Sequence, residues 1–292
     1  MERIIEIKNL KKNFNKTEAL KDVSFNINKG DVVGFIGPNG AGKTTTIRII
    51  LGLIKKTDGN IKVFNKDPWK DSTIIHSDIS YVPGDIALWD NLTGGEIIDL
   101  YMKLHGKGNI KKKEYLIERF KFDPRKKSKT YSKGNKQKVA LISALAVDAE
   151  LYIFDEPTSG LDPLMELVFQ EEVNKLKEKG KTILLSSHIL SEVEKIVNKV
   201  IIIRDGIIVE DGKLNELRHL TRSYVHIEAN EKLDKLIKLK LHDLEIKDNT
   251  ATFSVDNNNM RDTLKEISKL NITKIEINHP SLEDLFMRHY EN

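Results

Sequence analysis

The sequence predicts an α/β fold for residues 1–217, followed by a small α+β domain over residues 218–292. Three observations predict this division. A glycine-rich loop over Gly37–Thr45 lies between an apolar run and a segment with helical spacing. A second apolar run, Leu151–Phe154, is typical of a strand buried in a parallel sheet that helices cover on both faces. The C-terminal part follows the order strand, helix, strand, strand, helix, strand.

Length and composition narrow the class of protein. At 292 residues, the chain is long enough for one large domain and a smaller one. A hydrophobic fraction of 39% with 32% charged residues is typical of a soluble globular protein, and no apolar run is long enough to span a bilayer. The N-terminal segment alternates as a strand and carries an early acid, so we expect no signal peptide. Without cysteine the chain has no disulfide or zinc–cysteine site, and a net charge of +4 does not by itself indicate nucleic acid.

The glycine-rich loop, GPNGAGKTT, matches the phosphate-binding pattern G-x-x-x-x-G-K-[ST]. Its glycines allow backbone N–H groups to surround an anion, and the N-terminus of the following helix adds partial positive charge. We expect Lys43 to reach the terminal phosphates of a nucleotide, and Thr44 to bind Mg2+ through its hydroxyl. The residues predicted to bind the phosphates are Gly37, Pro38, Asn39, Gly40, Ala41, Gly42, Lys43, Thr44 and Thr45.

Residues 1–30 predict strands, because apolar and polar residues alternate over residues 23–27 and a Lys-Gly turn follows. Between the first two strands, residues 11–20 predict a polar loop with one aromatic residue, Phe14. Two interpretations of Phe14 stay open. Its ring stacks on a purine base, or it is an ordinary half-buried loop aromatic.

Downstream of the phosphate loop, residues 57–67 predict a short strand between two turns, and Ile79–Val82 predicts another strand. Residues 86–149 then show helical spacing, many lysines and no convincing strand. We therefore expect a helical insertion in the α/β domain, with amphipathic helices over residues 95–106 and 111–122.

A basic run, Arg125–Lys138, leads into the last helix of this insertion. It could contact nucleic acid or form a solvated surface, and the apolar helix that follows favours the surface. Ser132 is suited to cap that helix at its N-terminus, with Gly134 two residues later. A helix that begins in this way offers a second site for an anion.

Two adjacent acids, Asp155 and Glu156, follow the buried strand Leu151–Phe154. Ligands of α/β sheets bind at the carboxyl ends of the strands, so we expect both carboxylates at the nucleotide site. Asp155 is suited to bind Mg2+, directly or through water, and Glu156 to polarise an attacking water. The structural alternative is a pair of surface acids in a loop.

A helix over Leu164–Glu178 precedes a second buried strand that ends at His188. A lone histidine is usually structural, but this one follows a strand whose carboxyl end meets the same sheet edge as the two acids. We therefore predict that His188 senses the terminal phosphate. Residues 200–212 predict a hairpin that turns at Asp205-Gly206 and closes the domain.

The C-terminal domain has the split βαβ order of ferredoxin-like folds. Strands are predicted over residues 223–229, on either side of a turn at Asp248-Asn249 and over 272–278, and helices over 232–239, 260–270 and 281–290. Its acids and lysines indicate a solvated face rather than a catalytic site, so we expect a role in contact or regulation.

Residues 1 to about 215 resemble the ATP-binding subunit of an ABC transporter. The motifs that carry the resemblance are GPNGAGKTT for Walker A, YSKGNKQKV for the signature, LYIFDEP for Walker B, Ser159–Asp162 for the D-loop, His188 for the switch histidine and Phe14 for the adenine-stacking aromatic. The resemblance implies a P-loop NTPase with a RecA-like core, an antiparallel β subdomain and a helical subdomain. It implies catalytic roles for Lys43, Glu156 and His188, and binding of the ATP γ-phosphate by Ser132 and Gly134. The C-terminal domain, with its closing PSLEDLF, resembles the accessory domain on ATPases of bacterial exporters of drugs, peptides or lipids.

Two departures from the family pattern matter. The signature has Lys133 and Asn135 where the family usually has glycine and glutamine, while its serine and second glycine are kept. After the strand ending at Val82, the family has a glutamine that touches Mg2+ and the transmembrane partner, whereas this chain has Gly84 and then Asp85. Two roles for Asp85 stay open: a metal ligand that acts through a water, or the cap of a turn.

The resemblance implies an ATPase at the cytoplasmic face of the plasma membrane that couples hydrolysis of MgATP to export through a separate transmembrane permease. It also implies head-to-tail pairing with a second ATPase subunit, identical or homologous, so that ATP lies between the Walker A loop of one chain and the signature of the other. A rival class is a soluble ABC ATPase acting on ribosomes or DNA, but such proteins usually carry tandem ATPase domains or long coiled-coil insertions. A third class is an ATP-switched binding module, against which Glu156 argues. We therefore expect no nucleic-acid partner.

Overall fold

The computed structural model describes residues 2–219, 222–239, 241–256 and 259–278. The chain forms two compact units, residues 1–211 and 212–292. The strands that begin in the first unit are β1 (Arg3–Phe14), β2 (Thr17–Asn28), β3 (Val32–Ile36), β4 (Asp58–Val63), β5 (Ile79–Val82), β6 (Leu151–Asp155), β7 (Thr182–Ser187), β8 (Lys199–Arg204) and β9 (Ile207–Lys213). Its helices are α1 (Lys43–Ile50), α2 (Ser72–His76), α3 (Gly94–His105), α4 (Ile110–Arg119), the 3-10 helix η1 (Ser128–Thr130), α5 (Lys133–Leu145), α6 (Pro163–Glu178) and α7 (Leu190–Val193).

These strands form one sheet in the order β4-β1-β2-β9-β8-β3-β7-β6-β5. The five strands from β8 to β5 pair in parallel. β3, β6 and β7 are buried along their whole length, which confirms the continuous apolar strands that the sequence predicted. Because these strands are parallel neighbours, the residues that follow β3, β6 and β7 meet at the carboxyl edge of the sheet.

The antiparallel strands β4, β1 and β2 complete the sheet. Here the prediction of a polar loop over residues 11–20 was wrong. β1 continues to Phe14, which pairs with Thr17 at the start of β2. Pairing with β4 ends at Lys11, so pairing with β2 alone extends the strand to Phe14. The extension runs through polar residues because ladder hydrogen bonds do not depend on side-chain polarity. The predicted hairpin is confirmed, with left-handed backbone at Asp205 and Gly206.

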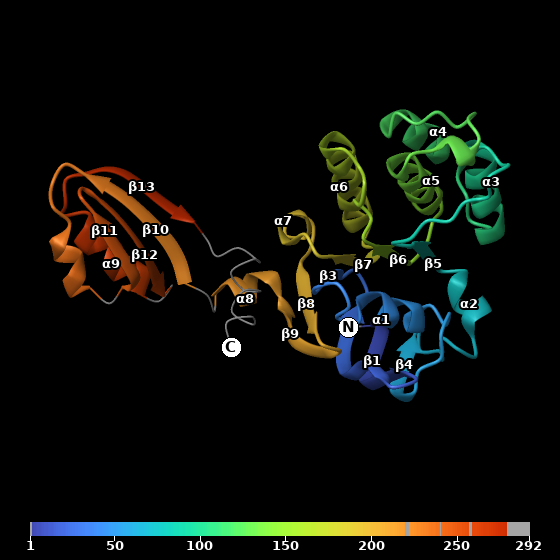
Figure 1. Ribbon diagram of the computed structural model, residues 1–292, viewed down its shortest axis with the longest axis horizontal. Coiled ribbons are helices and arrows are strands. Elements are labelled where there is room, and N and C mark those ends of the chain that lie inside the picture. The colour runs from blue at the N-terminus through green and yellow to red at the C-terminus, as the bar shows by residue number, and fades with distance from the viewer. Residues whose placement is uncertain (1, 220–221, 240, 257–258, 279–292) are drawn as a thin grey trace. The chain divides into compact units, whose positions relative to one another are not determined.

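The helical insertion contains α3, α4 and α5, which lie together beyond β5 and β6 in Figure 1. α3 begins with a capping box formed by Thr93 and Glu96, and ends at Gly106 in the left-handed conformation. α5 begins at Lys133, because the Ser132 side chain accepts a hydrogen bond from the N–H of Asn135. The predicted helices of this segment are therefore confirmed, while the short helix α2 was not predicted.

The second unit contains α8 (Leu214–His219), β10 (Arg222–Ala229), the 3-10 helix η2 (Asp234–Lys238), β11 (His242–Lys247), β12 (Thr250–Asp256), α9 (Met260–Ile267) and β13 (Ile272–Asn278). Its antiparallel sheet has the order β11-β12-β10-β13, as the split βαβ pattern predicts. The helix predicted over 232–239 is instead η2. Leu233 and Leu236 are both buried, and their spacing of three suits a helix with three residues per turn. The helix predicted over 281–290 lies outside the described residues.

Candidate functional site

The loop between β3 and α1 surrounds the side chain of Lys43. Its ammonium group donates hydrogen bonds to the carbonyl oxygens of Gly37 at 2.6 Å and Pro38 at 3.1 Å, and only 5% of the residue is exposed. Gly42, the residue before α1, has φ of +111°, a conformation open to glycine but strained for other residues. The loop therefore directs a cation to its own centre, beside the N-terminus of α1, where an anion would bind.

Burial lowers the pKa of Lys43 from its ordinary value, and the negative charges of Glu156 and Asp155 oppose this shift. The bound phosphates of a nucleotide would add further negative charge beside the ammonium group. They would favour its charged form, as any nearby opposite charge does.

Asp155 ends β6 and is fully buried. One carboxylate oxygen accepts a hydrogen bond from the hydroxyl of Ser186, which lies opposite it on β7. The other oxygen, Oδ2, is buried without a hydrogen-bond partner among the described residues. A buried carboxylate oxygen without a partner is costly, and a divalent cation would satisfy it.

The residues at this edge fit Mg2+ bound together with a nucleotide. In the described part of the chain, no cluster of three histidine, cysteine, aspartate or glutamate side chains could hold a metal ion. Mg2+ prefers octahedral oxygen ligands and usually takes several of them from water and substrate phosphates. The Asp155 carboxylate and the Thr44 hydroxyl are the ligands that this chain would supply.

Glu156 connects the predicted catalytic residues. Its Oε1 lies 3.8 Å from the ammonium nitrogen of Lys43, and its Oε2 lies 2.8 Å from Nδ1 of His188. The backbone of Glu156 has φ of +51°, which is rare for a residue with a side chain. Its N–H donates to the carbonyl oxygen of Ser186 at 3.1 Å, and this bond holds the strained turn in place. The structure thus brings Lys43, Glu156 and His188 together, as the sequence predicted.

Phe14 lies at the end of β1, and its side chain is 46% exposed. The ammonium group of Lys12 lies 4.7 Å from the centre of its ring. An exposed aromatic ring is available for stacking on a base. The adenine-binding role of Phe14 stays a prediction.

The signature segment packs against the loop that follows Glu156. A Cβ atom added at Gly134 would lie 2.5 Å from the carbonyl oxygen of Gly160, so only glycine allows this approach. The side-chain amide of Gln137 donates to the carbonyl oxygen of Pro157 at 2.7 Å. The predicted contact of Ser132 and Gly134 with a phosphate of a paired chain stays a prediction.

The segment after β5 lies beside the metal-binding acid. A Cβ atom added at Gly84 would lie 3.7 Å from the carboxylate of Asp155. A glutamine at this position would therefore start next to the metal site, and glycine leaves that space open. Asp85 is exposed and lines a cavity together with Lys133 and Lys136, so its predicted role as a metal ligand stays untested.

Sequence reasoning missed Ser186, which holds Asp155 in position. The signal was a pair of serines in the otherwise apolar strand TILLSS. A hydroxyl at the carboxyl end of a buried strand needs a partner, and the neighbouring strand β6 ends in the acid that provides it.

Comparisons with known proteins agree with this geometry. Residues 20–159 match the family described as ABC transporter, and residues 212–290 match the family described as ATP-binding protein DrrA1-3-like, C-terminal domain. The chain is 30% identical to the bacitracin transport ATP-binding protein BcrA of Enterococcus faecalis, over 99% of this chain and 96% of BcrA. The chain belongs to the ATP-binding proteins of ABC transporters.

Two further similarities extend this assignment. This ABC ATPase is 32% identical to the linearmycin resistance ATP-binding protein LnrL of Bacillus subtilis, over 97% of each chain. A solved dimeric, post-hydrolysis ATP-binding cassette with bound ADP and Pi matches 72% of this chain and 98% of its own, with a TM-score of 0.65 and 27% identity. The predicted P-loop NTPase fold, the ATP-binding function and the ATPase activity are therefore confirmed. The relatives found are transporter proteins, so the ribosome or DNA alternative has no support.

Proposed function

We propose that this ABC ATPase works at the cytoplasmic face of the plasma membrane and powers export of a drug, peptide or lipid through a separate permease. The observation that carries the proposal is similarity over nearly the whole chain to proteins named for bacitracin transport and linearmycin resistance. Within the described residues, no helix combines the length and apolar character needed to cross a bilayer. In this proposal the membrane-spanning path belongs to the separate permease.

The residues at the sheet edge suit hydrolysis of MgATP. Lys43 binds the terminal phosphates, and Glu156 orients and polarises the attacking water. His188 holds the Glu156 carboxylate through its 2.8 Å contact, and its proposed role is to sense the γ-phosphate. When bound to Asp155 and Thr44, Mg2+ supplies positive charge to the phosphate oxygens.

Two such chains, identical or homologous, pair head to tail in this proposal. Ser132 and Gly134 of one chain then complete the ATP site of the other. Support comes from the dimeric ATP-binding cassette that the first unit resembles. Support also comes from the start of α5, whose capped N-terminus can accept an anion.

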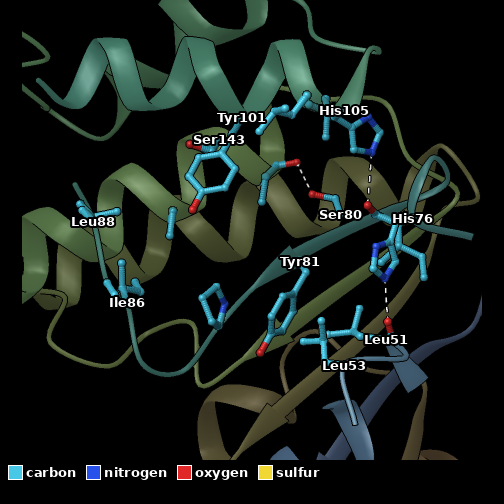
Figure 2. Close-up of a pocket in the computed structure, with 17 residues that line it drawn as sticks. Leu51, Leu53, His76, Ser80, Tyr81, Ile86, Leu88, Tyr101, His105 and Ser143 are labelled. Carbon is cyan, nitrogen blue, oxygen red and sulfur yellow. Dashed lines mark hydrogen bonds between the residues drawn. The ribbon is translucent and has the colours of Figure 1, made fainter. Parts of the chain in front are cut away.

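An apolar groove next to Gly84 is the proposed docking site for the permease. It has a volume of about 480 Å3 and is lined from α2, α3, α5, the segment after β5 and the end of α1. Figure 2 shows Tyr101 and Ser143 on the side of the helical insertion, and His76, Tyr81 and Leu53 on the side of the sheet.

Several polar groups in this docking groove already have partners within the chain, although Nδ1 of His105 is buried without one among the described residues. Nε2 of His76 lies 2.7 Å from the carbonyl oxygen of Leu51, and Nε2 of His105 lies 3.2 Å from that of Ile79. Because a carbonyl oxygen only accepts, each ring donates from Nε2. These bonds leave a mainly apolar surface in the groove. Such a surface suits the hydrophobic face of a helix from a partner protein.

Large apolar side chains surround the docking groove and remain exposed. Leu104 is 72% exposed and Trp89 is 51% exposed, and the Trp89 ring lies 6.0 Å from that of Tyr101. Exposed apolar patches of this kind mark interaction sites. We assign the groove to a short cytoplasmic helix of the permease, because it adjoins Gly84, where the family's glutamine touches the transmembrane partner.

The test is co-expression of the chain with its permease, followed by membrane fractionation. Leu104→Asp should move the ATPase from the membrane fraction to the soluble fraction and abolish resistance to the exported compound. Ile110→Asp is the matched control, because Ile110 is 65% exposed on α4 but does not line the groove. Equal membrane association of both variants would contradict the docking proposal.

A further inference from the structure

The two departures from the family pattern line the same cavity. This cavity, which we call the signature cavity, has a volume of about 260 Å3. Asp85 and Ile86 line it from the segment after β5, and Lys133 and Lys136 line it from α5. The residue that follows the missing glutamine therefore lines the same cavity as the lysine that replaces a signature glycine.

Lys133 at present contacts the loop that follows the catalytic glutamate. Its ammonium group donates a hydrogen bond to the hydroxyl of Ser159 at 2.7 Å. Its aliphatic part lies over Gly160, because a Cβ atom added at Gly160 would be 3.2 Å from Cγ and Cδ of Lys133. Ser159 in turn donates its N–H to the carbonyl oxygen of Glu156 at 3.2 Å. Lys133 thus restrains a loop that is continuous with Glu156.

Asp85 offers Lys133 a second partner. It is exposed, and it lines the same cavity as Lys133 and Lys136. An ammonium group prefers a carboxylate to a neutral hydroxyl, because a hydrogen bond between two charged groups is the stronger. Closure of the cavity that brings the two side chains together would therefore favour transfer of Lys133 from Ser159 to Asp85.

The signature cavity and the docking groove share one residue, Ile86. A partner that fills the groove would press on Ile86 and so move its neighbour Asp85 toward α5. This link rests on the proposed function, because it assumes that the permease occupies the groove. The contacts of Lys133 do not depend on that assumption.

We propose that Lys133 is a positioning residue with two partners, Ser159 in the open state and Asp85 in the state that hydrolyses ATP. Formation of the Asp85–Lys133 pair releases the loop after Glu156, so that Glu156 can orient water. Asp85 then replaces the family's glutamine by acting on the signature and not on the metal ion.

The test is a set of single and double variants of the full chain, assayed for kcat, KM for ATP and Mg2+ dependence. Asp85→Asn should lower kcat about twofold to fivefold, the effect of losing a surface ion pair, with KM unchanged. Ser159→Ala should raise kcat, because it removes the competing partner of Lys133. In a Lys133→Met background, neither change should have a further effect. Lys136→Met is the matched control, because it removes a lysine of the same cavity that has no hydrogen bond to Ser159.

Opposite signs for Asp85→Asn and Ser159→Ala distinguish positioning from a merely structural role, which would lower kcat in both. Exchange of the charges, Asp85→Lys with Lys133→Asp, should restore part of the lost rate. Additive effects in the Lys133→Met background would overturn the proposal. So would a higher Mg2+ requirement in Asp85→Asn, which would instead make Asp85 a metal ligand. None of these assays needs the permease, so failure of the docking proposal would leave their outcome unchanged.

Discussion

Ser186→Ala tests how the buried metal-binding acid is held. The substitution removes the hydroxyl that donates to Oδ1 of Asp155. It also removes the acceptor that lies 3.2 Å from the N–H of Glu156, although that N–H keeps its bond to the carbonyl oxygen of residue 186. Because Oδ2 of Asp155 has no partner among the described residues, both oxygens of a fully buried carboxylate would then lack one.

The expected loss follows from the charge on Asp155. A hydrogen bond to a charged group contributes about 1.5 to 3 kcal/mol to stability, more than a neutral one. For a unit of roughly 200 residues, about 2 to 4 °C are lost per kcal/mol, so the melting temperature should fall by about 3 to 12 °C. Saturating MgATP should shrink the difference, because Mg2+ then compensates the carboxylate.

The assay is thermal unfolding of the full chain with and without MgATP. The transition to compare is the one whose midpoint temperature rises when nucleotide is added. Ser143→Ala is the matched control, because this buried hydroxyl donates to the carbonyl oxygen of Val139 within its own helix. Its loss should change the melting temperature far less. If Ser186→Ala and the wild type have the same melting temperature in the absence of nucleotide, the hydroxyl does not stabilise Asp155 and this reasoning is wrong.

Three further predictions concern the site and the division of the chain. Glu156→Gln should bind ATP with unchanged affinity but hydrolyse it about a hundredfold more slowly or worse, and it should dimerise in MgATP; a monomer by light scattering would contradict the pairing model. Removal of residues 218–292 should leave a folded, ATP-binding unit, and a folded product that does not bind ATP would refute the predicted boundary. Burial, reinforced by the charge of Asp155, raises the pKa of Tyr81 to about 12, so stability should be lost as pH rises from about 10 through 12. Absorbance titration should show one tyrosine fewer ionising near pH 12 in Tyr81→Phe than in the wild type, and the same curve for both would refute the assignment.

Much of the fold could be predicted because local signals agreed with tertiary context. Leu151–Phe154 is apolar on both faces, as only a buried parallel strand requires, and Asp205-Gly206 supports the turn of a hairpin. The extension of β1 to Phe14 could not be foreseen, because pairing with β2 overrode the polar sequence. The 3-10 helix η2 was mistaken for an α-helix, because apolar residues three apart fit both periods.

The site was predictable where its residues are adjacent in sequence or end neighbouring strands. Lys43, Glu156 and His188 met this condition, and the structure brings them together. Contacts between distant segments were not predictable, since nothing in the sequence indicates that Lys133 reaches Ser159. The role of Asp85 also depends on the shape of a cavity, which periodicity and motif spacing cannot reveal.

Oδ2 of Asp155, which lacks a partner among the described residues, has a consequence for the lifetime of the protein in the cell. A ligand that binds only the folded chain adds to its stability, so the chain resists proteases best while it carries nucleotide. The chain that has lost both ATP and Mg2+ keeps a buried negative charge with one oxygen unsatisfied, and is the form nearest to unfolding. Degradation should therefore remove subunits without nucleotide first. The amount of this ATPase in the cell would then depend on the supply of ATP as well as on the rate at which the protein is synthesised.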